Sequence, residues 1–388
     1  MDNVIYLDYN GSAPLDPRVT EAIIEAHQHF GNAAASHIHG RRQALLVDDA
    51  RGHVANLVGF RPNDVIFTAG ATEGNNLAIQ GFAVTPSSAP PRVLISAVEH
   101  ASITQTARWL SNTGQIQLEV IPVSAGGDIN VDALTALLQE PADLVSVMAA
   151  NSETGILNPI DLIAEHVHNA GALFHCDATQ LVGRLPIPSG PDMISMSSHK
   201  ICGPTGVGAL VANQKVRNRL TPLIHGGGHE DGLRSGSPNV AGITGFGKAA
   251  ELAHLEGESD MIRVRPLRDR LAELLVSELS GVTQVGDINR RLPNTLSMHF
   301  ASTDAEAIMA NCPDIAMSAG SACSSGAIEP SAVLTAMGFD RDVAFEVLRL
   351  SLGRFTSDNE IERAASSIVT AVRYVRSLTG GEKPHATI

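Results

Sequence analysis

The stretch best suited to covalent chemistry is residues 196–204, where Lys200 follows small hydroxyl residues and precedes a Gly-Pro pair. Residues 192–196 are apolar and bounded by turn-forming residues, which predicts a buried strand that ends just before the lysine. Lysine loses its charge readily when it is desolvated, and it is the usual residue for Schiff-base chemistry with a carbonyl group. The alternative is a lysine at a strand end whose stem lies along apolar surface and whose ammonium reaches solvent.

A second candidate is Cys323, in a loop of small residues that runs from 317 to 327. Almost no side chain in this loop could anchor a core, so we expect an exposed and movable thiol rather than a structural one. Cys176 and Cys202 are better candidates for inert cysteines, because Cys176 alternates with Asp177 and faces the other side of its strand. Four cysteines without a Cys-x-x-Cys pair indicate reduced thiols.

Two glycine-containing turns could receive an anion. The apolar run 65–68 is followed by Ala-Gly-Ala-Thr-Glu and then by a predicted helix, whose first N–H groups and dipole favour a phosphate beside Thr72. In the alternative, Thr72 merely caps that helix. The second turn is 234–239. His225 and His229 have the spacing of zinc ligands on a helix, but the three glycines between them oppose a helix, so we expect no metal.

Strand-like and helix-like segments alternate from residue 65 to about 256, which predicts an α/β fold with a largely parallel sheet and helices on both faces. Ligands of such sheets gather at the carboxyl ends of the strands. Polar residues lie at or just past five such ends: Thr72, His100, Asn151, Asp177 and Lys200.

The two ends of the chain differ from this repeat. Asp16-Pro17 predicts a helix that runs to about residue 30, and a second helix covers 40–58. Helices over 242–256 and 262–279 close the large unit and begin a smaller α+β unit. We therefore expect a large domain over 13–257 and a small domain formed by 1–12 and 258–388.

Composition narrows the class of protein. A chain of 388 residues with 44% hydrophobic and 18% charged residues is typical of a compact enzyme. The net charge of −14 opposes binding to nucleic acid or to an anionic membrane surface. The sequence has neither a membrane-spanning apolar run nor a signal-peptide pattern, which predicts a cytoplasmic protein.

Eleven ordered motifs span almost the whole chain: 6–9, 31–32, 68–73, 99–100, 151–155, 175–180, 197–200, 226–230, 234–236, 321–323 and 351–354. With them the sequence resembles the NifS/IscS-like cysteine desulfurases, which are pyridoxal-phosphate enzymes of the class V aminotransferase family. The long serine-rich loop around Cys323 resembles the group with a mobile catalytic loop. The resemblance implies the fold type I of pyridoxal-phosphate-dependent transferases.

The resemblance also implies roles for individual residues toward pyridoxal 5'-phosphate. Lys200 would bond to the cofactor aldehyde and later move the substrate α-proton, and Asp177 would keep the pyridine nitrogen protonated. His100 would stack on the ring, and Gln180 would hydrogen-bond the ring hydroxyl. The implied phosphate contacts are Ala71, Thr72, Ser197, His199 and, across the interface of a homodimer, Ser237.

For the substrate, L-cysteine, the resemblance implies a carboxylate site formed by Asn151 and Arg354, with help from Asn32. The Cys323 thiolate, favoured by nearby cations, would attack the substrate sulfur. The products would be L-alanine and a persulfide on Cys323, whose sulfur passes to an acceptor such as an iron–sulfur scaffold protein.

Other readings stay open. A related enzyme such as a selenocysteine lyase would use Lys200 without a persulfide on Cys323. A non-enzymatic scaffold would keep the fold for partner binding, and the intact Lys200, Asp177, His100 and Cys323 argue against it. Small-residue departures from the family, such as Ser237 where threonine is usual, bear on positioning. The pathway that takes the sulfur is not specified.

Overall fold

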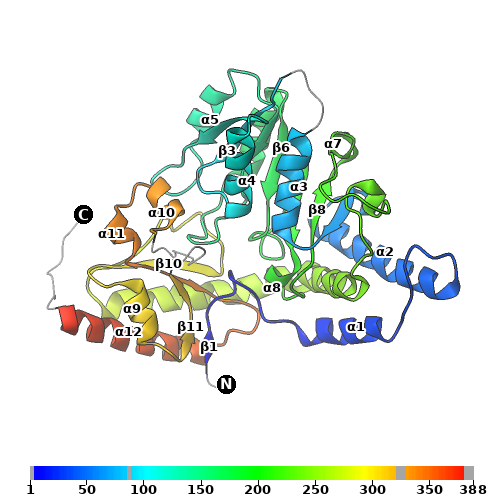
Figure 1. The fold of residues 1–388 in the computed structure, drawn as a ribbon. Coiled ribbons are helices and arrows are strands. Elements are labelled where there is room, and N and C mark those ends of the chain that lie inside the picture. The colour runs from blue at the N-terminus through cyan, green and yellow to red at the C-terminus, as the bar shows by residue number, and fades with distance from the viewer. Residues whose placement is uncertain (1–3, 85–88, 320–328, 380–388) are drawn as a thin grey trace.

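The computed structural model describes residues 4–84, 89–319 and 329–379. Figure 1 shows a large unit built on a twisted sheet and a smaller unit beside it, with one long helix running along both. The loop that carries Cys323 lies outside the described residues, so the expectation of a movable thiol stays a prediction.

In these ranges the large sheet has seven strands in the order β2-β8-β7-β6-β5-β3-β4. Neighbours from β7 to β4 pair in parallel, whereas β8 runs antiparallel to both β7 and β2. The predicted largely parallel sheet is therefore confirmed. The strands are β2 (Val65–Thr68), β3 (Arg92–Ser96), β4 (Gln117–Ile121), β5 (Leu144–Ser146), β6 (Leu173–Asp177), β7 (Met193–Ser197) and β8 (Gly208–Ala212).

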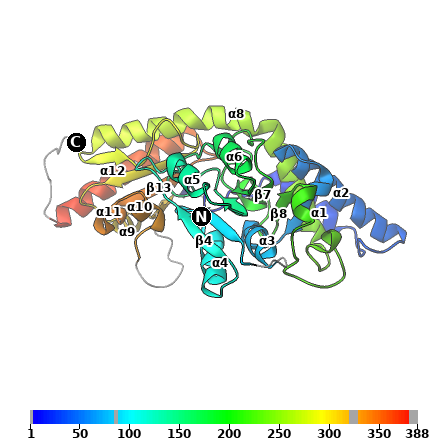
Figure 2. The same cartoon turned by 90° about the horizontal axis from the view of Figure 1, so that it is seen from above.

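Helices cover both faces of this sheet, which is why its central strands are apolar on both sides. Helices α3 (Ala71–Ala83) and α4 (Ala101–Asn112) lie on one face. Helices α2 (Ile38–Val58), α6 (Ile160–Asn169) and the first half of α8 (Val240–Glu278) lie on the other (Figure 2).

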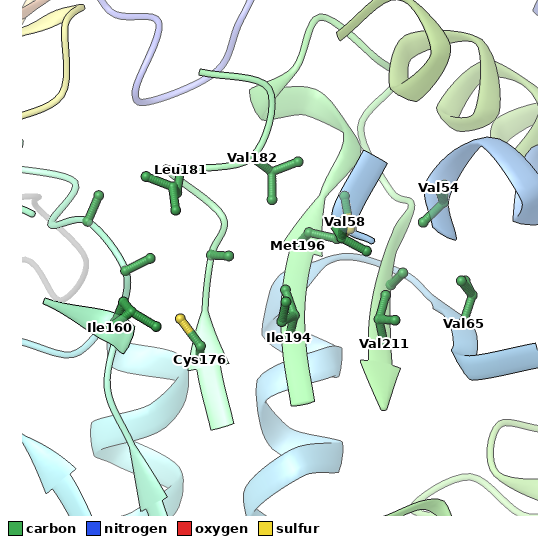
Figure 3. Packing of buried hydrophobic residues seen from close by; sticks show 14 of the residues in the cluster. Val54, Val58, Val65, Ile160, Cys176, Leu181, Val182, Ile194, Met196 and Val211 are labelled. Carbon is green, nitrogen blue, oxygen red and sulfur yellow. The ribbon is translucent and has the colours of Figure 1, made fainter. Parts of the chain in front are cut away.

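Alternation along the strands sends neighbouring side chains into opposite layers. Cys176 packs with Ile194 and Met196 in the core beneath α2 and α6 (Figure 3). The adjacent Asp177 instead meets Asn75 of α3 on the opposite face. The predicted inert character of Cys176 is confirmed, because burial raises the pKa of its thiol well above the usual value.

The small unit has its own core. Its antiparallel sheet has the order β12-β13-β10-β9, and β1 pairs in parallel with β11. Ile5 and Leu7, from the start of the chain, are buried with the second half of α8 and with α12. The strands are β1 (Ile5–Tyr6), β9 (Val282–Gln284), β10 (Thr295–Phe300), β11 (Ile315–Ala316), β12 (Ser318–Ala319) and β13 (Val347–Ser351).

The remaining helices are mostly short. Within the described ranges none of the helices is long and apolar enough to cross a membrane. They are α1 (Pro17–His27), α5 (Val131–Leu137), α7 (Gln214–Arg217), α9 (Ala305–Ala310), α10 (Ala332–Ala336), α11 (Arg341–Ala344) and α12 (Asp358–Thr379).

One helix differs from the sequence prediction. Residues 242–279 were expected to form two helices, but α8 is continuous over 39 residues and contains Pro266. Gly257 does not end a helix. A Cβ at Gly257 would lie 2.5 Å from the Gly183 carbonyl oxygen, so glycine there allows close packing between backbones.

A substitution at Gly208 tests the packing at the start of β8, beside the turn that leads into α3. A Cβ on Gly208 would lie 2.5 Å from the Met196 carbonyl oxygen and 2.8 Å from the Gly70 Cα, so one backbone must move. We expect Gly208→Ala to lower the free energy of unfolding by about 1–3 kcal/mol in denaturant titrations.

Gly52→Ala in α2 is the control. A Cβ at Gly52 meets no described atom within 4 Å, so this variant should gain about 0.5–1 kcal/mol from helix propensity. Wild-type stability of the Gly208→Ala protein would contradict the close approach between β8, β7 and Gly70.

Candidate active site

Lys200 lies at the end of a 3-10 turn (Ser198–Lys200) that directly follows β7. Its Nζ donates hydrogen bonds to the backbone oxygens of Asn10 and Gly11, each at 2.6 Å. Burial, followed by the positive charges of Arg184 and Arg349, lowers the pKa of this ammonium to about 8. Lys200 is thus a poorly solvated lysine, and a useful fraction of it is the neutral, nucleophilic amine near neutral pH.

A buried relay leads from Asp177 to His100. Asp177 Oδ2 accepts a hydrogen bond from Asn75 Nδ2 at 2.8 Å, and the same amide donates to Ser102 Oγ at 2.9 Å. Ser102 Oγ lies 2.8 Å from His100 Nδ1, which also accepts from the Ser102 backbone N–H. These partners leave the proton of a neutral His100 ring on Nε2. His100 itself caps α4 and is exposed, as a ring that stacks on a ligand must be.

Gln180 and Arg184 lie on the loop after β6 and are both buried. Gln180 Nε2 donates to the Asn10 carbonyl oxygen at 3.1 Å, so Lys200 and Gln180 share one acceptor. Arg184 Nη1 donates to Gln180 Oε1 at 2.5 Å. These contacts bring Gln180 and Lys200 to one carbonyl oxygen.

The start of α3 is the candidate phosphate site. The helix begins at Ala71 with Gly70 as its N-cap residue and without a side-chain cap, so the alternative in which Thr72 caps the helix is wrong. Gly70 has a φ of 150°, and a Cβ there would lie 3.7 Å from Ser197 Oγ. Thr72 is exposed on the first turn. The N–H groups of a first helical turn have no carbonyl within the helix, which suits a phosphate.

His199 and Ser237 differ in how closely they approach this site. His199 Nδ1 lies 3.1 Å from Ser12 Oγ, and burial followed by the neighbouring Lys200 charge lowers the pKa of His199 to about 4. Its ring is therefore neutral at physiological pH. Ser237 is exposed on the 234–239 turn, which Arg234 ties to α3 through a 2.9 Å ion pair with Glu73.

Arg354 and Arg349 are both candidates for binding the carboxylate of a substrate. Arg354 is paired with Asp16 at 2.9 Å and with Asp260 at 2.7 Å, so its guanidinium is already neutralised. Arg349 pairs with Asp8 at 2.6 Å and donates to the Ser152 carbonyl oxygen at 3.1 Å. Its buried Nε has no hydrogen-bond partner in the described part of the chain.

The structure places the other predicted substrate residues as follows. Asn151 is buried, and its side chain holds the 151–155 turn: Oδ1 accepts from the backbone of Glu153 and Thr154, and Nδ2 donates to the Val98 carbonyl oxygen. Asn32 is exposed on the loop between α1 and α2, where it bonds the Ala34 backbone N–H.

The group of residues that the structure joins fits pyridoxal 5'-phosphate. A buried carboxylate at Asp177 suits a protonated ring nitrogen, a poorly solvated amine at Lys200 suits an aldehyde, and the α3 start with Ser197 suits a phosphate. Asn75 Oδ1 is buried and lacks a partner among the described residues, as expected beside a ligand. No cluster of metal-ligating side chains is found in the described ranges.

Sequence reasoning missed four contributors: Asn10, Asn75, Arg184 and Arg349. Asn75 could have been noticed, because it interrupts the apolar face of α3 between Gly74 and Leu77. Asn10 and Arg349 carry no comparable signal, since their partners lie hundreds of residues away in the sequence.

Comparison with known proteins identifies the family of the chain. A family model described as aminotransferase class-V matches residues 5–364. The chain is 42% identical over 380 residues to the cysteine desulfurase IscS of Anaeromyxobacter sp. (strain Fw109-5), covering 97% of this chain and 94% of that protein.

Solved structures give the same result. A NifS-like protein superposes with a TM-score of 0.89 and 31% identity, covering 96% of this chain and 100% of that one. SspA in complex with cysteine has a TM-score of 0.81 and 29% identity, covering 91% of this chain and 100% of that one.

The state of Lys200 can be tested without any ligand. In the protein freed of cofactor, labelling of Lys200 by a small amine-reactive reagent should rise with a midpoint at about pH 8, because only the neutral amine reacts. Peptide mass spectrometry across a pH series gives this profile, with Lys248, which is paired with Glu251, as internal reference. A profile that rises only near the ordinary lysine value of about 10.4 would show a solvated side chain.

Proposed function

This chain belongs to the aminotransferase class-V family, and we propose that it is a cysteine desulfurase of that family, which uses pyridoxal 5'-phosphate to convert L-cysteine to L-alanine. The observation that carries the proposal is that Lys200 and the buried carboxylate of Asp177 lie at the carboxyl ends of the neighbouring strands β7 and β6, where their charges interact and burial lowers the pKa of Lys200. A buried carboxylate beside a lysine of lowered pKa, at the carboxyl ends of adjacent strands, is typical of a functional site.

The roles of the chain's own residues follow from their surroundings. Bound pyridoxal 5'-phosphate supplies an electron sink that makes the α-proton of an amino acid acidic. Asp177 is held by Asn75 and the Thr179 backbone N–H, and it would keep the ring nitrogen protonated. Lys200 Nζ, neutral in part, accepts the α-proton and later returns it.

For the phosphate we propose Ala71, Thr72, Ser197 and His199, with Ser237 of a second subunit. Support comes from the α3 start and from Ser197 Oγ beside Gly70. A neutral His199 contributes as a hydrogen-bonding group rather than as a charge.

For the substrate carboxylate we propose Arg349 as the bidentate partner, with Arg354, which lines one pocket together with Lys200, as the alternative. Arg349 contacts the Ser152 carbonyl oxygen, next to Asn151, and its charge reaches Lys200. Arg354 is engaged by Asp16 and Asp260 and ties the end of β13 to α1 and α8. Asn151 then supports the site by holding its turn. The role of Asn32 in binding the substrate carboxylate stays a prediction, and it requires a second subunit to complete the site.

The sulfur chemistry is assigned to Cys323. Its thiolate attacks the substrate sulfur, so an S–S bond forms while the substrate C–S bond breaks, and the carbon framework keeps the electron pair and takes up a proton to leave as L-alanine. Two guanidinium groups close to Lys200 make this region favourable for a thiolate. The resulting persulfide carries the sulfur onward.

We also propose a homodimer that works in the cytoplasm and passes sulfur to an acceptor protein such as an iron–sulfur scaffold. Ile24, Phe30, Ile38 and Leu45, on α1, α2 and the loop between them, are each more than half exposed. Figure 1 shows this connection at the outer edge of the molecule, away from the small unit. Apolar side chains gathered there suit a second copy of the chain. The kinship with IscS supports the acceptor.

Cys323→Ala tests the persulfide. This variant should lose nearly all alanine formation from L-cysteine under multiple turnover, because the sulfur has no acceptor thiol, while it still binds the cofactor. Alanine is measured by amino-acid analysis. Lys200→Ala serves as the control, which should lose both alanine formation and cofactor binding. If Cys323→Ala released sulfide at the wild-type rate, the reaction would be that of a lyase without a protein persulfide.

Paired arginine variants test the carboxylate site. Arg349→Met should weaken L-cysteine binding about 10- to 100-fold, the usual cost of a lost charge-assisted hydrogen bond. It should also abolish the preference for L-cysteine over cysteamine, which lacks the carboxylate. Arg354→Met should instead lower the thermal stability and keep that preference. The reverse pattern would restore Arg354 as the ligand.

A further inference from the structure

We propose that Arg184 is a positioning residue, which fixes the direction of the Gln180 amide and places a permanent positive charge beside Lys200. The role goes beyond the binding of cofactor and substrate, because Arg184 acts on two groups that contact the cofactor. The part that concerns Gln180 rests on the proposed function, whereas the part that concerns Lys200 does not.

The geometry around Arg184 is closed. Its side chain is buried, and Nη1 donates to the backbone oxygen of Gln180 at 2.7 Å and to Gln180 Oε1 at 2.5 Å. Nη2 donates to the Tyr9 carbonyl oxygen at 3.4 Å. One guanidinium thus donates hydrogen bonds to both the main chain and the side chain of Gln180, which restricts the rotation of that side chain.

The direction of the Gln180 amide follows from the chemistry of arginine. A guanidinium has only donors, so the amide atom that faces Arg184 must be the oxygen. The Gln180 nitrogen is therefore turned toward Asn10, whose carbonyl oxygen takes one of its two N–H groups at 3.1 Å. The second N–H remains for a ligand. Toward a bound cofactor Gln180 would act only as a donor, which would favour the anionic form of a ring oxygen.

Among the described residues no carboxylate pairs with Arg184, and the acidic group that acts on its charge is the Cys202 thiol, whose pKa burial raises to about 11. In the described part of the chain its hydrogen-bond acceptors are two carbonyl oxygens and one amide oxygen, all uncharged. Burial lowers the pKa of Arg184 to about 10, so it stays protonated at neutral pH. Arg184 and Lys200 line one cavity of the molecule. The charged groups that act on Lys200 are Arg184 and Arg349, which oppose its protonation, and Asp8 and Asp177, which favour it. Arg184 therefore opposes protonation of Lys200.

The chain contains a matched control in Arg291. It is also buried, donates to Gln284 Oε1 at 3.1 Å and to the Val285 carbonyl oxygen at 2.9 Å, and burial lowers its pKa to about 10. Its charge is not among those that act on Lys200. Losing Arg291 costs a similar buried network without removing a charge from the site.

The first experiment uses the protein freed of cofactor. At pH 7, Arg184→Met should slow the labelling of Lys200 by about tenfold. A rise of about one unit in the pKa of Lys200 would leave about one-tenth as much of its neutral, reactive amine. Arg184→Lys keeps the charge and should label at close to the wild-type rate. Arg291→Met should label like wild type. Thermal unfolding of each variant identifies any change that comes from lost folding.

The second experiment titrates the visible absorption of the bound cofactor against pH. Gln180→Leu and Arg184→Met should each raise the midpoint by about one pH unit, the value of one hydrogen bond. The charge effect of Arg184 is the difference between the midpoints of Arg184→Met and Arg184→Lys. Once it is subtracted, the double variant Gln180→Leu/Arg184→Met should shift the midpoint no further than Gln180→Leu alone, because both substitutions remove the same contact.

Each outcome decides the inference. Wild-type labelling of Lys200 in Arg184→Met would overturn the charge role, and independent, additive shifts of Arg184→Met and Gln180→Leu would overturn the amide role. A failure of the proposed function has a different signature, because the wild-type protein would then form no alanine from L-cysteine while the labelling result would stand unchanged.

Discussion

The structure around the carboxyl ends of the central strands depends on one constraint: a half-buried ammonium group, that of Lys200, lies beside two guanidinium groups. Lys200, Arg184 and Arg349 carry three formal positive charges in a region where water is scarce. Such a cluster of positive charges is stable only if anions and carbonyl oxygens compensate the charge or if one of the three groups loses its proton. Asp8 and Asp177 supply part of the balance, and the backbone oxygens of Asn10 and Gly11 supply more. An anionic ligand such as a phosphate or a carboxylate completes it.

Asn10 is the junction that makes this arrangement rigid. Its side chain donates to Ser152 of the large unit and to Thr295 of the small one, and its backbone N–H donates to Ser351. Its carbonyl oxygen serves Lys200 and Gln180 together. The N-terminal segment therefore lies between the two units and fixes the reactive lysine against both. A single asparagine, buried to 1% exposure, couples the fold of three segments to the chemistry of one side chain.

The fold was largely predictable, because it rests on local signals. The strand predicted over 192–196 is β7, shifted by one residue, and the helix predicted from Asp16-Pro17 is α1, because an apolar run defines the first and a capping pair the second. The prediction of two helices over 242–279 was wrong, because Gly257 and Pro266 usually end helices and here pack inside one. In the site, Lys200 and Asp177 stood out because each lies at or just past the carboxyl end of a strand. The choice between Arg349 and Arg354 was beyond local reasoning, since both are arginines within one short stretch at the end of β13 and only their partners differ.

The sequence by itself determined the alternation of strands and helices, the kind of chemistry and the residues that stand at strand ends, because periodicity and motif order are written along the chain. Tertiary structure alone decided which of these groups meet and in which state. The lowered pKa of Lys200 arises from burial and from charges that lie 16 and 149 residues away in the sequence. The direction of Gln180 depends on what Arg184 can donate. Desolvation and charge proximity depend on distance in space, and only the folded chain defines that distance.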